Sequence, residues 1–276
     1  MKFTKMQGCG NDYIFIDATQ KQFDFKSELA TKMSDRHFGV GSDGLVFIEK
    51  SDVADFKMDF YNSDGSSAEM CGTALRCLCK FVYENSLTMQ TDLSVETLAG
   101  IKNCRLNVQD GAVTDVTVNM GSPIFDARKI PVDMDAERVF GYPLSVENGC
   151  YYINALSMGN PHAVIFCRDI ADIDIDRIGK AIENHPFFPR KTNVEFIYPC
   201  QSDISMRVFE RGAGETLSCG TGACAAAVVA VQTGMCAENV KIHTKGGTLA
   251  VFYDRKNNEV YLKGEAVRVF DGDFFE

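Results

Sequence analysis

The feature that most restricts how this chain can fold is an internal duplication that runs almost from end to end. Cys71 and Cys219 each precede a Gly-Thr pair and a helix-like segment, and they lie 148 residues apart in a chain of 276. Gly10-Asn11 is repeated as Gly159-Asn160 at nearly the same spacing. A constant offset between several matched pairs is the signature of a duplicated structural unit. We therefore expect two similar halves that face each other.

Further matched segments surround both cysteines. Phe60-Tyr61-Asn62 matches Val208-Phe209-Glu210, and each is followed by a short glycine-containing loop and then by the cysteine. Strand-like residues 45–48 match residues 194–197. The repeat predicts an N-terminal half-domain of residues 1–121 plus 266–276 and a C-terminal half-domain of residues 122–265. Each half-domain holds one cysteine, and a ligand is expected in the cleft between them.

The hydrophobic pattern predicts more strand than helix. Short alternating or β-branched runs are separated by Asp-Gly, Asn-Gly and Gly-Gly turn signals. Residues 73–84 and 222–233, which follow the two cysteines, are apolar on most faces, and such helices must be buried. Two more helices are expected at residues 27–36 and 175–184. The expected fold class is α+β, with two pseudo-symmetric halves, each a mostly antiparallel β-sheet wrapped around a central buried α-helix.

Composition excludes several classes of function. The formal charge of −10 and the lack of Lys and Arg runs argue against a nucleic-acid partner. No stretch reaches the ~18 consecutive apolar residues of a membrane helix. The eleven cysteines are irregularly spaced, and residues 1–16 lack the charged and apolar regions of a secretory signal. We expect a cytoplasmic protein with reduced thiols, no membrane partner and a small-molecule substrate.

The position of the two cysteines predicts acid–base chemistry. A thiol at a helix N-terminus lies near unpaired backbone N–H groups and the positive end of the helix dipole, which favour thiolate and also bind carboxylates. Two such thiols predict two bases. Neighbouring thiols do not easily both ionise, because the first negative charge repels the second. One base and one acid are the expected result.

Each cysteine also has a simpler interpretation. A lone cysteine before Gly-Thr is often a buried apolar residue, so the catalytic interpretation depends on the matched pair. Other cysteines fall within or after the helices and are expected in the core, namely Cys77, Cys79, Cys224 and Cys236. A zinc site drawn from Cys71, Cys77, Cys79 and Cys219 lacks the usual paired spacing of ~2–4 residues, so no metal is expected. Structural or surface roles are expected for His37, His185 and His243.

Five motifs, taken together and in order, resemble the diaminopimelate epimerase family. They are KMQGCGND at residues 5–12, YNSDG at 61–65, MCG at 70–72, SMGNPH at 157–162 and ERGAGETLSCGTGAC at 210–224. The resemblance covers nearly the whole chain. It implies an amino-acid racemase that needs no cofactor, with two domains that each hold a helix within β-sheets, and it implies a homodimer.

The resemblance also implies a mechanism. One cysteine, as thiolate, removes the Cα proton of LL-diaminopimelate, and the other, as thiol, protonates the opposite face to give the meso form, a step in lysine and peptidoglycan precursor biosynthesis. Without pyridoxal phosphate, the carbanion must spread its charge onto the substrate's own carboxylate. Backbone N–H groups near Gly72-Thr73 and Gly220-Thr221 would stabilise that charge in a site closed to water.

The resemblance assigns further residues to the site. His162 and Glu210 are expected near Cys71 and Cys219, where they would help to ionise or hold the thiols. An arginine bonds both oxygens of a carboxylate, so Arg211 is expected to grasp the distal end of a diamino dicarboxylic acid. The full set of expected substrate-binding residues is Asn11, Asn62, Gly72, Thr73, Asn160, Asn193, Glu210, Arg211, Gly220 and Thr221.

Two departures from the family pattern keep other functions open. The family usually has Asn where this chain has Thr73, and Gln where it has Gly44, whose repeat partner is roughly Asn193. A racemase of another amino acid, such as histidine or glutamate, is therefore the first alternative. The second is a Cys-His hydrolase that uses one cysteine as nucleophile and His162 as base. That alternative leaves the other cysteine unexplained.

Overall fold

The computed structural model describes residues 1–147, 149–200 and 202–275, and the chain divides into two compact units. The first unit consists of Met1–Asn119 and Lys263–Glu276, and the second of Met120–Leu262. Among the described residues, no helix combines the length and the apolar character needed to cross a bilayer. Within each unit, hydrogen-bonded strands form most of the structure.

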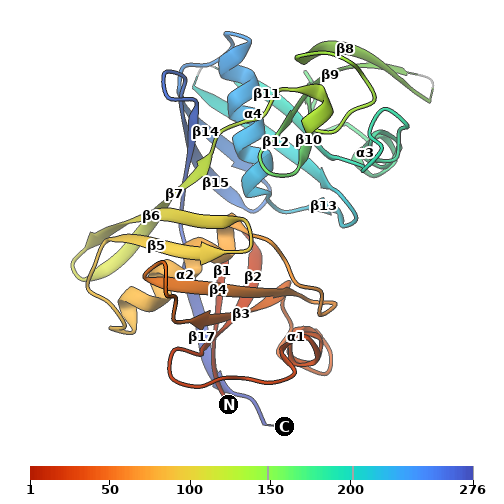
Figure 1. Ribbon diagram of the computed structural model, residues 1–276. Helices are drawn as coiled ribbons and strands as arrows, with labels where there is room; N and C mark the ends of the chain where they lie inside the picture. The colour runs from red at the N-terminus through yellow and green to blue at the C-terminus, as the bar shows by residue number, and fades with distance from the viewer. Residues whose placement is uncertain (148, 201, 276) are drawn as a thin grey trace. The chain divides into compact units, whose positions relative to one another are not determined.

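The first unit is a mixed sheet with two helices (Figure 1). Its strands lie in the order β17-β1-β2-β3-β4-β5-β6-β7, where the β2–β3 and β4–β5 pairs are parallel and the other pairs antiparallel. The elements are β1 (Lys2–Gly8), β2 (Asn11–Asp17), α1 (Lys26–Ser34), β3 (Gly44–Glu49), β4 (Phe56–Asn62), α2 (Gly72–Glu84), β5 (Asp92–Thr97), β6 (Gly100–Gln109), β7 (Ala112–Gly121) and β17 (Val267–Asp273).

The second unit has the same kind of sheet (Figure 1). Its paired strands lie in the order β8-β9-β10-β11-β12-β14-β15, and β13 also pairs with β12. The elements are the 3-10 helix η1 (Ala127–Lys129), β8 (Val139–Val146), β9 (Gly149–Ser157), β10 (Pro161–Phe166), α3 (Ile175–Glu183), β11 (Asn193–Cys200), β12 (Asp203–Glu210), β13 (Gly214–Thr216), α4 (Gly220–Gln232), β14 (Asn239–Thr244), β15 (Gly247–Asp254) and β16 (Glu259–Gly264).

Strand pairing repeats between the units. From β2 to β6 the successive pairs are parallel, antiparallel, parallel and antiparallel, and the series β10-β11-β12-β14-β15 has the same alternation. Tyr13 pairs with Gly44 in the first unit, and His162 pairs with Asn193 in the second, each residue 149 positions later. The duplicated α+β fold expected from the sequence is confirmed.

The helices after the two cysteines form the centre of each unit. In α4, the run from Ala223 to Val231 is buried throughout, and α2 buries most of its length, including Leu75, Leu78 and Val82. Burial on most faces is what the apolar composition of both segments predicts. The structure starts α4 two residues before the expected position, because the helix begins directly after Cys219.

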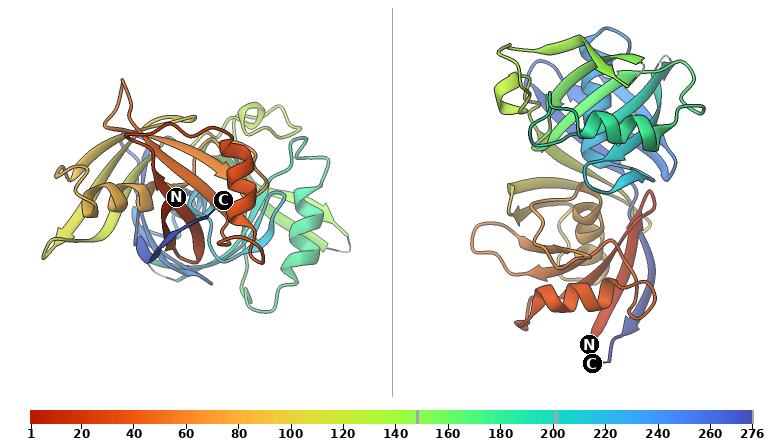
Figure 2. Two further views of the ribbon diagram at one scale, coloured as in Figure 1. Left: turned by 90° about the horizontal axis from the view of Figure 1, so that it is seen from below. Right: turned by 90° about the vertical axis from the view of Figure 1, so that its right-hand side faces the viewer.

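The outer helices begin and end within two residues of the expected ranges. In α3, the Asp174 side chain accepts a hydrogen bond from the Arg177 N–H and so caps the helix N-terminus. Ile178 and Ile182 face the core of the second unit, and α3 lies on the outside of that unit's sheet (Figure 2). In the first unit, the Met1 amino group donates to the Phe274 carbonyl at 2.7 Å, which holds the two chain ends together (Figure 2).

Candidate active site

Both cysteines occupy the N-cap position of a buried helix with the same backbone geometry. Cys71 has φ −135° and ψ 123° before α2, and Cys219 has φ −129° and ψ 119° before α4. Their carbonyls accept from Leu75 and Ala223, respectively, at 2.9 Å. The expectation that each cysteine lies at a helix N-terminus is confirmed. The first N–H groups of such a helix have no partner within the helix, so each cysteine lies where negative charge can be bound.

Cys71 has a hydrogen-bond partner that the sequence analysis missed. The Tyr13 hydroxyl lies 3.1 Å from the Cys71 sulfur, and the tyrosine ring packs edge-on against Phe60 with centroids 5.5 Å apart. Tyr13 lies in the mostly apolar strand β2 and belongs to none of the five motifs. The internal repeat could have drawn attention to Tyr13, because Tyr13 occupies the position equivalent to the expected site residue His162.

Cys219 is almost fully buried, with 5% of its surface exposed. Burial raises the pKa of the Cys219 thiol well above its ordinary value, and the carboxylates of Glu210 and Glu195 raise it further. The Thr221 hydroxyl, 3.5 Å from the sulfur, and the Gly222 N–H act in the opposite direction. At Cys219, burial therefore opposes the thiolate form that a helix end favours.

Glu210, at the end of β12, is placed to accept a proton from Cys219. Burial raises the pKa of the Glu210 carboxyl, while hydrogen bonds from the Thr216 hydroxyl and the Cys219 thiol lower it in part. A carboxylate that accepts a thiol hydrogen bond in a poorly solvated place can take up the thiol proton. The structure thus brings Glu210 and Cys219 together, as the sequence analysis expected.

His162 reaches Cys219 only through other side chains. Its Nε2 lies 2.9 Å from the Asn160 Oδ1, and the Asn160 amide donates to the Thr221 hydroxyl at 3.3 Å. Thr221 in turn contacts the Cys219 sulfur. His162 is completely buried. These contacts connect the imidazole to the Cys219 sulfur through Asn160 and Thr221.

Glu195 is a second residue that the sequence analysis missed. One of its oxygens, Oε1, lies 2.7 Å from the His162 Nδ1, and both side chains are fully buried. The other oxygen, Oε2, has no hydrogen-bond partner among the described residues. A Cβ at Gly222 would lie 2.7 Å from Oε1, so only glycine lets this carboxyl approach the first turn of α4. No sequence signal marked Glu195, because it lies in an apolar strand.

The residues expected at the distal end of the substrate lie where β11 begins and β12 ends. Asn193 is buried, and its amide donates to the Pro161 carbonyl at 2.9 Å and accepts from the Arg211 N–H at 3.0 Å. In this structure Asn193 therefore fixes the backbone that carries Arg211. The Arg211 guanidinium is exposed and donates to the Arg190 carbonyl at 3.2 Å.

The expected site residues of the first unit lie on strand ends and the start of α2. Asn11 begins β2, and Asn62 ends β4, where its amide donates to the Ser66 hydroxyl at 3.0 Å. Thr73 is buried, and its hydroxyl accepts from the Nη2 of Arg76 at 3.2 Å. Arg76 is fully buried, and its Nη1 has no partner among the described residues. The sequence analysis missed this buried cation, one turn into α2.

Gly44 faces Asn62 across the β3–β4 pair, and its place leaves no room for a side chain. A Cβ built there would lie 2.4 Å from the Tyr61 carbonyl oxygen and 2.8 Å from the Phe60 ring. The nearest atom belongs to the backbone and cannot turn aside. The glutamine that the resembling family usually carries at this position could not enter without a shift of strand β4.

We expect Gly44→Gln to lower the free energy of unfolding by about 1–3 kcal/mol, because the new Cβ overlaps the Tyr61 carbonyl. Urea unfolding followed by circular dichroism measures the change. Gly44→Ala is the matched control, and it should carry most of the cost, since the collision begins at Cβ. A Gly44→Gln protein as stable as the wild type would contradict this account.

Three of the four further cysteines expected in the core lie there, and Cys236 does not. Cys77, Cys79 and Cys224 are fully buried, and Cys236 is partly buried. Burial raises the pKa of Cys77 to about 12, so this thiol is unreactive at neutral pH. Across the part of the chain that the structure describes, no group of three or more His, Cys, Asp or Glu side chains is placed to hold a metal ion.

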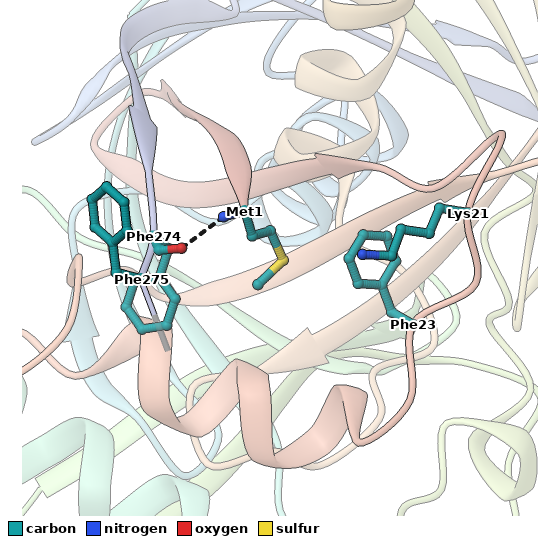
Figure 3. A pocket seen from close by; sticks show the side chains of 5 residues that line it. All are labelled: Met1, Lys21, Phe23, Phe274 and Phe275. Carbon is teal, nitrogen blue, oxygen red and sulfur yellow. Dashed lines mark hydrogen bonds between the residues drawn. The ribbon is translucent and has the colours of Figure 1, made fainter.

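A surface hollow in the first unit lies apart from these groups (Figure 3). It is lined by Met1, Lys21, Phe23, Phe274 and Phe275. The lining is mainly aromatic, and its cation, the Lys21 ammonium, lies 5.0 Å from the centroid of the Phe23 ring. Among the described residues, the lining contains no thiol, carboxylate side chain or imidazole that could supply the acid–base chemistry of the two cysteines.

The fold has relatives among solved structures. A phenazine biosynthesis protein of the PhzF family from Bacillus anthracis matches with a TM-score of 0.72 at 17% identity, over 100% of this chain and 99% of that chain. A hydroxyproline epimerase from Agrobacterium vitis matches with a TM-score of 0.66 at 16% identity, over 99% and 90%. At such identities the likeness shows the fold alone, which is the duplicated α+β fold that these proteins share.

Sequence comparison is more specific. The family model described as diaminopimelate epimerase matches residues 3–125 and 154–269. A diaminopimelate epimerase from Desulfovibrio desulfuricans is 48% identical over 282 residues, covering 100% of this chain and 98% of that protein. One from Methanococcus maripaludis is 47% identical over 274 residues, covering 99% of each. The chain belongs to the diaminopimelate epimerase family, and the resemblance seen in the sequence is confirmed.

Proposed function

We propose that this protein is an epimerase that interconverts LL-diaminopimelate and meso-diaminopimelate, without a cofactor, by two-base proton transfer at Cα. A relative that bears this name is 48% identical over the full chain. The structural observation that carries the proposal is the pair of cysteines at the N-termini of two buried helices, one in each half of a duplicated chain. Such a pair suits the removal of a proton from one face of a carbon and its return to the other.

In the proposed reaction, the protons balance between the two thiols. One thiolate takes the Cα proton, the C–H electron pair moves into the substrate carboxylate, and the other thiol gives its proton to the opposite face. When Cys219 is the base, Glu210 first accepts its proton, and the Thr221 hydroxyl and the Gly222 N–H stabilise the thiolate. When Cys219 is the acid, the buried thiol supplies the proton.

The substrate's charged groups have suitable partners in the proposed site. The carboxylate next to Cα would bind to the first N–H groups of α2 and α4, at Gly72-Thr73 and Gly220-Thr221, where the developing charge is stabilised. The exposed Arg211 guanidinium would bind the distal carboxylate. The remaining proposed contacts to the amino and carboxylate groups are Asn11, Asn62, Asn160, Asn193 and Glu210.

The alternatives have different support. Gly44 has no side chain where the family usually carries a glutamine, and the Tyr61 carbonyl leaves no room for one, so a substrate contact from that glutamine is missing. This observation favours a different amino-acid substrate as the second candidate. The hydrolase alternative is weaker, because both ring nitrogens of His162 are engaged, one by Glu195 and one by Asn160. An imidazole held in this way has no nitrogen left to activate a thiol directly.

We further propose that the protein is a homodimer that works in the cytoplasm. Strand β17 exposes Val267, Val269 and Phe270, an apolar strip of the kind that protein interfaces cover. The proposed chemistry needs two reduced thiols, which a reducing compartment maintains.

A substrate panel in deuterated water tests the proposed function. The purified protein is incubated separately with diaminopimelate, histidine, glutamate and lysine, and the stereoisomers are separated by chiral chromatography and weighed by mass spectrometry. We expect LL-diaminopimelate to give the meso form with one deuterium at the inverted Cα. If histidine or glutamate were turned over and diaminopimelate were not, a racemase of another amino acid would replace the diaminopimelate epimerase as the proposed function. The absence of deuterium at Cα with every substrate would contradict both functions.

A further inference from the structure

The two halves of the chain place different groups beside their cysteines. Tyr13 on β2 and His162 on β10 are equivalent in the repeat, since each pairs with the first residue of the next parallel strand. Tyr13 contacts Cys71 directly, at 3.1 Å. His162 is instead turned to Glu195 and Asn160. The duplicated unit has therefore diverged at the residue next to the thiol.

The Tyr13 hydroxyl is rigidly held. Tyr13 has 6% of its surface exposed, and its ring packs edge-on against Phe60. A tyrosine fixed in this way loses little entropy when it bonds to sulfur. A phenol ordinarily ionises near pH 10 and a thiol near pH 8.5. If one of the two groups has lost its proton, the proton that remains is therefore bound to the tyrosine oxygen. The sulfur then carries the charge and accepts the hydrogen bond.

The environment of Cys219 has the opposite character. Burial, together with the carboxylates of Glu210 and Glu195, raises the pKa of its thiol well above the ordinary value. The Cys219 thiol lies close enough to the Glu210 carboxyl to lower the pKa of that carboxyl. Cys71 is only partly buried and faces a phenol. The two thiols therefore lie in different environments.

We propose that Tyr13 is a positioning residue that donates a hydrogen bond to the sulfur of Cys71 and makes Cys71 the resting thiolate, while Cys219 rests as the thiol. This inference deepens the proposed function and rests on it for its catalytic meaning. In the resting enzyme, the stereoisomer that presents its Cα–H bond to Cys71 reacts without a prior proton shift. The stereoisomer that presents it to Cys219 requires the proton of Cys219 to move to Glu210 first, and it requires Cys71 to take up a proton from solvent so that Cys71 can act as the acid.

The test is Tyr13→Phe, which removes only the hydroxyl. Purified protein without substrate is treated with iodoacetamide at pH 7, and the alkylation rate of each cysteine is followed by peptide mass spectrometry. We expect Cys71 to react about tenfold more slowly, because a hydrogen bond to a charged group is lost. The exposed Cys150 and Cys200 are internal references that should keep their rates. In the epimerase assay, kcat should fall about tenfold with little change in KM, since Tyr13 touches the sulfur and not the substrate.

Tyr253→Phe is the matched control. Tyr253 is also buried, and its hydroxyl bonds to Asn258 and Gln232, away from either thiol. Its loss should leave the reactivity of Cys71 unchanged. Alkylation of Cys71 in Tyr13→Phe within about twofold of the wild type would overturn the inference, and so would an equal loss in Tyr253→Phe. Alkylation needs no substrate, so it tests the role of Tyr13 independently of the epimerase assay. If the protein did not turn over diaminopimelate, the proposed function would be contradicted, while the alkylation rate of Cys71 would still test the effect of Tyr13.

Discussion

Replacing either Cys71 or Cys219 by alanine is expected to lower kcat by about 10³-fold or more, because each variant lacks one of the two groups that move the Cα proton. Inversion needs a base on one face and an acid on the other, so the loss should be similar for both variants. Chiral chromatography of the product from LL-diaminopimelate measures the rate. Circular dichroism establishes that the variants keep the fold.

Cys150→Ala is the control for the two cysteine variants. Cys150 is exposed on β9 and belongs to no proposed contact, so its replacement should leave kcat unchanged. The double variant Cys71→Ala, Cys219→Ala should be little slower than either single variant, because the two thiols act as a unit. Near-normal turnover by either single variant would exclude a two-base mechanism.

The second large effect is expected for Glu210→Gln, which should lower kcat by about 10²- to 10⁴-fold. Glutamine keeps the shape of the side chain but cannot accept the thiol proton of Cys219. The pH profile gives a further check. Because burial raises the pKa of Glu210 and only the ionised form accepts a proton, the wild-type rate should fall on acidification at a pH above the usual glutamate range. The residual rate of the variant should lack this acidic decline.

Glu215→Gln is the matched control for Glu210→Gln. Glu215 lies five residues further along the chain, on β13, and its carboxylate pairs with Arg207 and Lys245. Its replacement should keep kcat and the acidic decline. If Glu210→Gln retained the wild-type rate, Cys219 would not depend on this carboxylate, and the proposed proton acceptor would have to be sought elsewhere.

The fold was largely predictable because the sequence contains two copies of the same structural unit. Glycine-asparagine pairs, strand-like runs and cysteine-led helices recur at one offset, and the matching strand pairs of the two units follow from this. The apolar character of α4 predicted a buried helix. Its exact start was less predictable, since Gly220 and Thr221 are poor helix formers, yet the helix includes both and has Cys219 at its N-cap position.

The site was predictable in its cysteines and less so in their surroundings. Spacing alone placed Cys71 and Cys219 at helix ends, and the resemblance drew attention to His162 and Glu210. The contacts of Tyr13 and Glu195 depend on which side chains meet across neighbouring elements. Both residues lie next to apolar residues in the sequence, and that pattern does not indicate which side chains they contact. The raised pKa of Cys219 also depends on burial, which the N-cap position does not reveal.

The structure gives a physical reason for the glycine at position 44, where the family usually has glutamine. In the sequence it is only a missing side chain. In the structure, the Tyr61 carbonyl lies so close that any Cβ at position 44 would collide with it. The difference from the family pattern is therefore built into the backbone of β4, and a change at Gly44 alone cannot reverse it.

The claim on which the account depends is that the two sulfur atoms act on one carbon from opposite faces. A crystal structure of the wild-type protein with an unreactive analogue of diaminopimelate tests it most directly. We expect the sulfurs of Cys71 and Cys219 on opposite faces of the analogue's Cα, each within about 3–3.5 Å of it. A complex in which both sulfurs lie on one face, or in which either lies away from the ligand, would contradict the account.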